Sequence, residues 1–169
     1  SDARITTALL SLTFIMGVFG TVQGSYEEGF VYLLMFLPII LSLNLDTIVA
    51  LMIVIFGTQA GCAASIVNPF STGIASGIAG ISPGEGIIFR AISFVVLMSL
   101  TSFLICSYAK KIKKNPEKSV QYYRHQQDIE EFVSIGDGNE TLDKRQRKVF
   151  YIFIATFAIM IVSLIPWTS

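Results

Sequence analysis

The feature that most constrains this chain is an interruption inside an otherwise apolar region. Residues 57–80 are rich in glycine and in uncharged hydrogen-bonding side chains, and Asn68-Pro69-Phe70 lies at their centre. Proline removes one helical hydrogen bond and frees a carbonyl group. Hydrocarbon cannot satisfy free backbone groups, so a helix broken at membrane depth must turn the break toward protein, water or a bound solute. Many membrane carriers build their solute sites in this way.

Composition places the chain in a membrane. Hydrophobic residues make up 53% of the sequence and charged residues 14%, whereas an average soluble domain has about 25% charged residues. Ten of the twelve lysine and arginine residues lie between Lys110 and Lys148. Because segments rich in lysine and arginine tend to lie on the cytoplasmic side of a membrane, we expect this segment to be cytoplasmic. It forms no basic face interleaved with aromatic residues, so we expect no nucleic-acid partner.

The sequence predicts an all-α, polytopic membrane protein. Apolar segments 5–22 and 30–43 flank a polar tip, and the second has only about 14 residues against the roughly 20 that a spanning helix needs. Residues 5–43 therefore predict a re-entrant helical hairpin, with two ordinary spans as the alternative. Asp46 is well placed to cap a third helix that begins at Thr47. We expect that helix to be regular to about Thr58 and broken beyond it.

Three regions follow from this pattern. The membrane region covers residues 1–110, with the hairpin at 5–43, the broken transmembrane helix at 47–80, a turn at 81–86 and a full span at 87–109. A cytoplasmic polar loop follows at 111–146, and residues 147–169 predict a further transmembrane helix. Residues 1–4 have the character of internal sequence, so we expect a piece of a longer protein.

The break supplies the candidate solute site. Hydroxyl, amide and freed carbonyl groups are oxygen ligands for a small cation, and a half-helix beginning near Ser71 would direct its positive end at a carboxylate. The alternative is that Gly73 and Gly77, a GxxxG pair, serve only close helix packing. The candidate solute-binding residues are Ser65, Asn68, Pro69, Phe70, Ser71, Thr72 and Gly73.

The polar tip supplies candidates for ion coupling, which are Ser25, Glu27, Glu28 and Gln59. A charge at the bilayer centre costs at least about 2.5 kcal/mol, so acidic residues at that depth usually face a cavity or a partner. If both flanking segments are full spans, the two glutamates instead belong to a solvated loop. Arg90 is a counter-charge for Glu85 or for an anionic solute, or a snorkelling side chain.

Enzymatic motifs are missing from the sequence, which has no His-Glu-x-x-His pattern and no nucleophile paired with a base. We therefore expect no enzyme and no cofactor, with Na+ as a candidate coupling ion.

Several motifs in order resemble a known family. They are Gly24, Glu27-Glu28, Thr58-Gln59, Asn68-Pro69-Phe70, Gly77-Ile78-Ala79-Gly80, Arg90 and Lys113-Lys114-Asn115-Pro116. Over roughly residues 5–118 the chain resembles the anaerobic C4-dicarboxylate carrier family and its YfcC-like relatives, bacterial secondary transporters of a larger ion-transporter superfamily. Ser76, where relatives often carry glutamine, and Ser25-Tyr26 before the glutamates depart from the pattern and leave the substrate open.

The resemblance implies the architecture and the partners. Such proteins are similar to elevator-type carriers built from two inverted repeats, and this chain would be part of the amino-terminal half. Its partners would be the lipid bilayer of the bacterial inner membrane, the remaining half of the transporter, a second copy in a homodimer, and a small anionic or zwitterionic solute.

Residues and resemblance together predict a secondary active transporter. It would move a small carboxylate-bearing solute, either a C4-dicarboxylate or an amino acid, coupled to a sodium or proton gradient. The alternative is a non-transporting membrane scaffold or assembly subunit, in which the glycine and serine positions serve only helix contacts.

Overall fold

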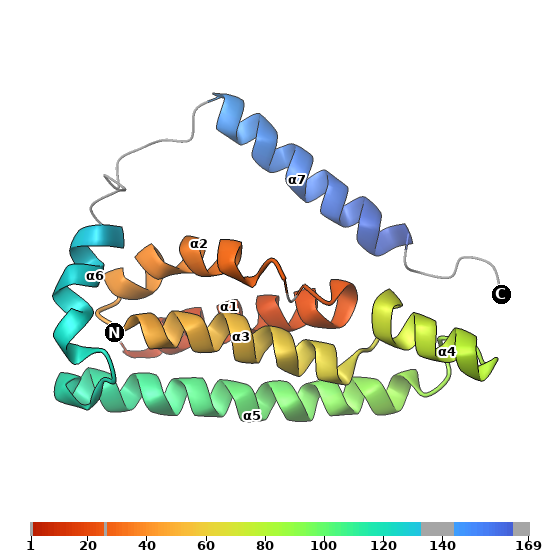
Figure 1. Cartoon of the computed structure of the whole chain (residues 1–169), viewed down its shortest axis with the longest axis horizontal. Coiled ribbons are helices and arrows are strands. Elements are labelled where there is room, and N and C mark those ends of the chain that lie inside the picture. Colours follow the sequence, from red (N-terminus) through yellow and green to blue (C-terminus); the bar gives the residue numbers. More distant parts are fainter. Residues whose placement is uncertain (1, 26, 133–143, 164–169) are drawn as a thin grey trace. The chain divides into compact units, whose positions relative to one another are not determined.

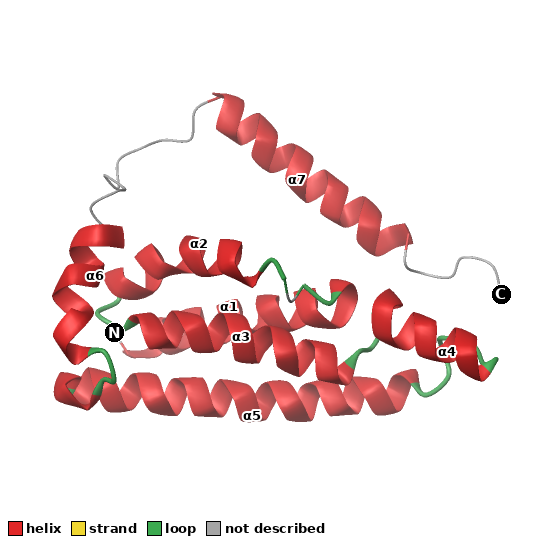
Figure 2. Ribbon diagram, in the orientation of Figure 1, coloured by secondary structure: helices red, strands yellow, loops and turns green. Residues whose placement is uncertain are grey.

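A computed structural model describes residues 2–25, 27–132 and 144–163. Every regular element within these residues is helical (Figure 2). The chain forms two compact units, residues 1–135 and 136–169, and each is described by itself.

Helix α3 (Thr47–Ala64) is the central element of the first unit. It packs along α1 (Asp2–Gln23), and it also contacts α2 (Gly29–Ser42) and α5 (Ile87–Lys114). In Figure 1, α1 and α3 run in one direction, while α2 and α5 run in the opposite direction. The π-helical segment η1 (Pro69–Gly73) and the short helix α4 (Ile74–Ala79) continue the chain beyond α3.

Three helices of the described residues are long and apolar enough to cross a bilayer: Asp2–Gln23, Thr47–Ala79 and Ile87–Lys114. The second of them contains the break. Helix α2 has only 14 residues, as the sequence predicted. Helices α1 and α2 are antiparallel, as a hairpin requires, but α2 packs chiefly against α3 rather than along α1. A re-entrant depth for this pair remains a prediction.

Backbone contact joins α1 to α3. A Cβ atom built on Gly61 would overlap the carbonyl group of Gly17, and one built on Gly20 would overlap the carbonyl oxygen of Thr58. A Cβ atom on Gly57 would lie 3.1 Å from the carbonyl oxygen of Thr13. Absent side chains let two helices approach closely. Around this crossing the core is apolar and includes Leu9, Met16, Ile40, Leu41, Val49, Ile53 and Ile105.

The polar segment after α5 is partly folded, which differs from the predicted loop at 111–146. Helix α5 continues to Lys114, beyond its predicted end at Ala109. Turns of 3₁₀ helix follow, η2 (Pro116–Lys118) and η3 (Tyr122–Arg124), and then α6 (His125–Phe132), which contacts α2. Segment 115–132 therefore covers one end of the helical bundle (Figure 1).

The second unit contains helix α7 (Lys144–Ser163), which corresponds to the further transmembrane helix predicted over 147–169. Residues 133–143 and 164–169 lie outside the described residues. A crossing of the membrane by α7 stays a prediction.

Candidate functional site

The predicted break exists, but it begins later than expected. Helix α3 is regular to Ala64 instead of Thr58, and it ends at Ser65, whose φ of 45° and ψ of 55° are left-handed. The helical path resumes at Pro69 as a π-helical turn. A left-handed residue ends the regular hydrogen-bonding pattern of a helix. Residues 65–68 are thus the irregular segment.

Asn68 holds the resumed helix in place. Its side chain is only 3% exposed. The Oδ1 atom accepts hydrogen bonds from the amides of Phe70 at 2.9 Å and Ser71 at 3.3 Å, and Nδ2 donates to the carbonyl of Gly20 at 3.4 Å. The N-terminus of the resumed helix carries partial positive charge and was predicted to face a carboxylate. In the structure, the Asn68 side chain caps that N-terminus instead.

Three hydroxyl groups gather across the break. The Ser65 hydroxyl hydrogen-bonds with that of Ser71 and, at 2.7 Å, with that of Thr72. Thr72 Oγ1 also donates to the Ser65 carbonyl at 2.5 Å. On the other side, the Ile66 amide donates to Thr21 Oγ1 of α1 at 2.8 Å. The structure thus brings Ser65, Asn68, Ser71 and Thr72 together and ties them to α1, while their role in binding a solute stays a prediction.

Free carbonyl groups line the same segment. The carbonyls of Cys62, Ala63 and Ala64 end α3 and accept no hydrogen bond from the described residues, and neither do those of Ile66 and Val67. A helix C-terminus carries partial negative charge, so these groups attract a cation.

The remaining residues of the predicted solute site do not face this cluster. Phe70 is 71% exposed, and Pro69 is exposed beside it. Gly73 has only ordinary contacts, with Pro69 and Asn68, and a Cβ atom on Gly77 would meet nothing within 4 Å. Within the described residues, the close-packing glycines are therefore those of α1 and α3, and not the pair Gly73 and Gly77.

Of the predicted ion-coupling residues, only Ser25, in the tip between α1 and α2, lies near the break. Gly24, with a φ of 71°, lies against the Asn68 side chain. Ser25 follows it and is 1% exposed. The Ser25 hydroxyl makes no hydrogen bond of normal geometry with the described residues, although the Tyr32 hydroxyl lies nearby. The tip and the break are thus in contact.

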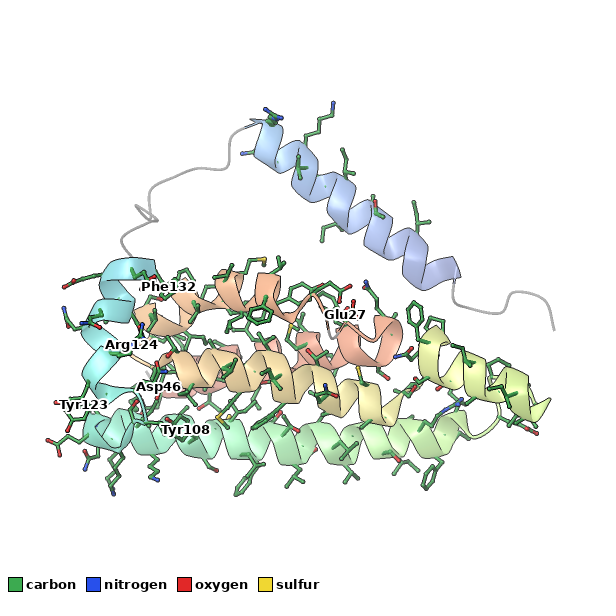
Figure 3. All side chains as sticks on the ribbon, viewed as in Figure 1. Glu27, Asp46, Tyr108, Tyr123, Arg124 and Phe132 are labelled. Atoms are coloured by element: carbon green, nitrogen blue, oxygen red, sulfur yellow. The ribbon has the colours of Figure 1, made fainter. Side chains whose placement is uncertain are left out.

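The acidic residues and Gln59 lie apart from the break. Glu27 and Glu28 are exposed, and Gln59 is on an exposed face of α3. Glu27 lines a cavity of about 250 Å³ between α2 and α3, together with Phe30, Leu33, Leu51, Val54 and Ile55. Figure 3 shows Glu27 toward the opposite end of the bundle from Asp46. Neither glutamate side chain forms a hydrogen bond or an ion pair with the described residues, although the backbone carbonyl of Glu28 accepts from the amides of Val31 and Tyr32.

Arg90 belongs to the turn before α5. Its Nη2 atom donates to the carbonyl of Pro83 at 2.5 Å. Among the described residues it forms no ion pair with Glu85. The arginine therefore closes the turn at 81–86.

A second polar centre lies at the other end of the bundle. Asp46 is 3% exposed. Its Oδ1 atom accepts from the Val49 amide at 3.0 Å, which confirms the predicted cap. Its Oδ2 atom accepts from the hydroxyls of Tyr108 at 2.7 Å and Ser119 at 2.6 Å. One carboxylate thus connects α3, α5 and the segment that follows α5.

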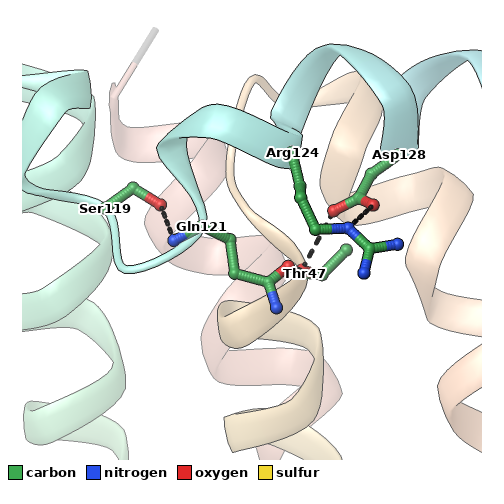
Figure 4. A network of polar contacts seen from close by, with 5 residues as sticks. All are labelled: Thr47, Ser119, Gln121, Arg124 and Asp128. Atoms are coloured by element: carbon green, nitrogen blue, oxygen red, sulfur yellow. Dashed lines mark hydrogen bonds and ion pairs between the residues drawn. The ribbon is translucent and has the colours of Figure 1, made fainter.

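Thr47 extends this connection to α6 (Figure 4). Its hydroxyl hydrogen-bonds with Gln121 Oε1 at 2.5 Å and Asp128 Oδ2 at 3.3 Å. Arg124 lies 3.7 Å from the other Asp128 oxygen. These partners were not predicted, because they are 74 to 81 residues apart from Thr47 in sequence. The described residues contain no group of three or more His, Cys, Asp or Glu side chains suited to a metal.

Comparison with known proteins identifies the family. Residues 3–168 match the family described as C4-dicarboxylate anaerobic carrier, DcuC. An uncharacterized protein of Haemophilus influenzae is 32% identical over 154 residues, which cover 90% of this chain and 30% of that protein. The Escherichia coli protein named "Putative basic amino acid antiporter YfcC" is 30% identical over 128 residues, covering 72% of this chain and 25% of that protein.

No solved structure matches the chain. The chain spans between a quarter and a third of the length of these curated relatives. The family is one of transporters and not of enzymes, and the helices long enough to cross a bilayer agree with it. With residues 3–168 matched, the chain belongs to the C4-dicarboxylate anaerobic carrier family.

Proposed function

We propose that this chain is part of a secondary active transporter for a small carboxylate-bearing solute. The observation that carries the proposal is the break at 65–68, which lies within an apolar segment of 33 residues, Thr47–Ala79. Hydroxyl groups, one carboxamide and free carbonyls gather there. Such groups are costly within a membrane unless they serve a polar ligand or a neighbouring segment.

The arrangement suits a cation and a solute held near each other. Free carbonyls at the end of α3 provide oxygen ligands for Na+, and the hydroxyls of Ser65, Ser71 and Thr72 can exchange their mutual hydrogen bonds for bonds to a solute. In this proposal Asn68 both caps the resumed helix and donates through Nδ2 to the solute. Pro69, Phe70 and Gly73 belong to the proposed solute-binding segment as its backbone, since their side-chain positions do not face the hydroxyl cluster.

Two solute classes remain candidates. The family description names C4-dicarboxylates, and the Escherichia coli relative is named for basic amino acids. Both classes carry a carboxylate, which is the group that the proposed site recognises. Coupling to a sodium or proton gradient would involve Ser25, Glu27, Glu28 and Gln59.

The proposal also covers the membrane in which the protein lies and the other parts of the transporter. The basic residues between Lys110 and Lys148 favour a cytoplasmic position for that segment, and the family relation favours a bacterial inner membrane. The remaining half of the transporter and a second copy of the protein would complete the assembly. The predicted inverted repeats and elevator-type movement would be properties of the complete transporter.

Substitution of Asn68 tests the solute role separately from the capping role. Serine is as good a helix cap as asparagine, but it has no carboxamide donor. We expect Asn68→Ser in the full-length protein to keep its folded yield while uptake falls about tenfold or more, the consequence of losing a hydrogen bond to a charged group. The measurement is gradient-driven uptake of succinate, arginine and lysine into proteoliposomes, each with an imposed sodium or proton gradient.

Ser99→Ala is the matched control, because within the described part of the chain the Ser99 hydroxyl hydrogen-bonds only to the carbonyl of Val95 in α5. Normal uptake by Asn68→Ser would limit Asn68 to capping and remove it from the solute site. The scaffold alternative makes a different prediction: Gly77→Leu would impair assembly, while changes at Asn68 would leave it unaffected.

A further inference from the structure

A groove between α1 and α5 joins a basic mouth to an apolar interior. At the mouth, a cavity of about 410 Å³ is lined by Lys110, Lys113 and Lys114 of α5 and by Asp2 of α1. A second cavity of about 580 Å³ continues along the same two helices, lined by Leu10, Phe14, Val95 and Phe103. Thr6 and Cys106 line both cavities. The two therefore form one continuous groove, which we call the α1–α5 groove.

The mouth carries an excess of positive charge. Lys113 Nζ lies 2.9 Å from Asp2 Oδ1, so the charges of this pair offset each other. Lys110 and Lys114 are exposed, and neither forms an ion pair with the described residues. Two lysines at the end of a spanning helix are thus available for an anion at the level of the lipid headgroups.

Beyond the mouth the groove is apolar. The hydroxyl of Thr6 donates to the carbonyl of Asp2 at 3.0 Å, and that of Ser99 donates to the carbonyl of Val95 at 2.7 Å, so neither requires a ligand. Leu10, Phe14, Val95 and Phe103 are exposed hydrophobic residues. The Phe14 and Phe94 rings meet edge to face at 6.2 Å. Among the described residues the lining is therefore mostly carbon, and the Ser102 hydroxyl is its one hydroxyl for which no hydrogen bond is formed.

The length of the groove fits one leaflet. From Thr6 to Phe14, α1 rises about 12 Å along its axis. One leaflet contributes about 15 Å of the roughly 30 Å hydrocarbon core. An acyl chain that starts beside Lys110 and Lys114 would therefore follow the groove through most of that leaflet.

We propose that the α1–α5 groove binds one anionic phospholipid. Its phosphate lies against Lys110 and Lys114, and one acyl chain lies along Phe14, Val95 and Phe103. Charge complementarity favours this occupant over a zwitterionic lipid, since basic pockets between transmembrane helices recognise anionic headgroups. The proposal is independent of the solute site at the break.

Photo-crosslinking of lipids tests the proposal in the full-length protein. Nanodiscs would contain a small fraction of either phosphatidylglycerol or phosphatidylcholine with a diazirine in the acyl chain. Mass spectrometry would then measure crosslinks to residues 6–14 and 94–106. We expect phosphatidylglycerol to exceed phosphatidylcholine about fivefold, because the two lysines attract the anionic headgroup.

Matched variants locate the headgroup. Lys110→Gln/Lys114→Gln leaves the Lys113 ion pair intact and is expected to bring the ratio of the two lipids to about one, since the attraction to the headgroup is lost. Lys111→Gln/Lys118→Gln removes as much charge from exposed lysines that do not line the groove, and the preference should persist. Ser102→Trp, which fills the groove, should reduce crosslinking of both lipids there.

Three results would overturn the proposal. One is equal crosslinking of the two lipids to the wild-type protein. Another is a preference that survives loss of Lys110 and Lys114. The third is abolition of the preference by millimolar inorganic phosphate, which would reveal a site for free anions instead of a lipid.

Discussion

Gly61→Ala is expected to prevent most of the full-length protein from folding. The added methyl group would overlap the carbonyl of Gly17 and would lie 2.9 Å from the amide nitrogen of Thr21. Both neighbours are backbone atoms of α1, so no side chain can rotate away. Overpacking costs typically about 1–3 kcal/mol where side chains can adjust, and a backbone obstacle exceeds that range. The measurement is the monodisperse fraction in detergent, together with the melting temperature of any material that remains.

Gly29→Ala is the matched control. A Cβ atom at Gly29 would lie 3.5 Å from a methyl group of Val54, an ordinary contact. Alanine is favoured over glycine in helices by about 1 kcal/mol or less, so this variant should fold as well as the wild type. Equal behaviour of Gly61→Ala and Gly29→Ala would refute backbone contact between α1 and α3.

Asp46→Ala is expected to produce the second largest effect, a loss of about 2–4 kcal/mol of stability, because it removes a helix cap, worth about 1 kcal/mol, and hydrogen bonds to a charged group, worth about 1.5–3 kcal/mol. The substitution removes the cap of α3 and leaves the hydroxyls of Tyr108 and Ser119 without their acceptor. Thermal unfolding of the full-length protein in detergent would measure the change. Limited proteolysis should also cut segment 115–132 faster, because that segment loses its attachment to α3.

Asp46→Asn separates the two parts of this effect. Asparagine keeps the oxygen that caps the helix but replaces a charged acceptor by a neutral amide, so the loss should be smaller than for alanine. Glu117→Gln changes an exposed charge in the same segment and should stay within about 0.5 kcal/mol of the wild type. A loss for Asp46→Ala no greater than for Glu117→Gln would contradict the role of Asp46.

Local signals in the sequence predicted much of this fold. Asp46 before an apolar run predicted the cap, and Pro83-Gly84 predicted the turn before α5. The dense polar and glycine residues around Asn68 predicted the break, because proline and left-handed residues cannot continue a regular helix. Its onset was wrong: residues 58–64 remain helical, since Gly57, Thr58 and Gly61 pack against the backbone of α1.

Contacts between distant residues could not be predicted in this way. Asp46 meets Tyr108 and Ser119 across 62 and 73 residues of sequence, and no spacing rule links them. The glycine pair that was noticed, Gly73 and Gly77, is open within the described residues. Gly57 and Gly61 have the same spacing and make the close contact. Only the arrangement of the helices distinguishes one pair from the other.

The close crossing of α1 and α3 also determines what can move. Close backbone contact resists sliding, so we expect α1 and α3 to move together as one frame that ends at Ser65. Beyond that residue, α4 is attached through η1 and a few hydroxyl and amide bonds. In the proposed transporter, we expect a rearrangement that admits a solute to move η1 and α4 about residues 65–68 while α1 and α3 keep their places.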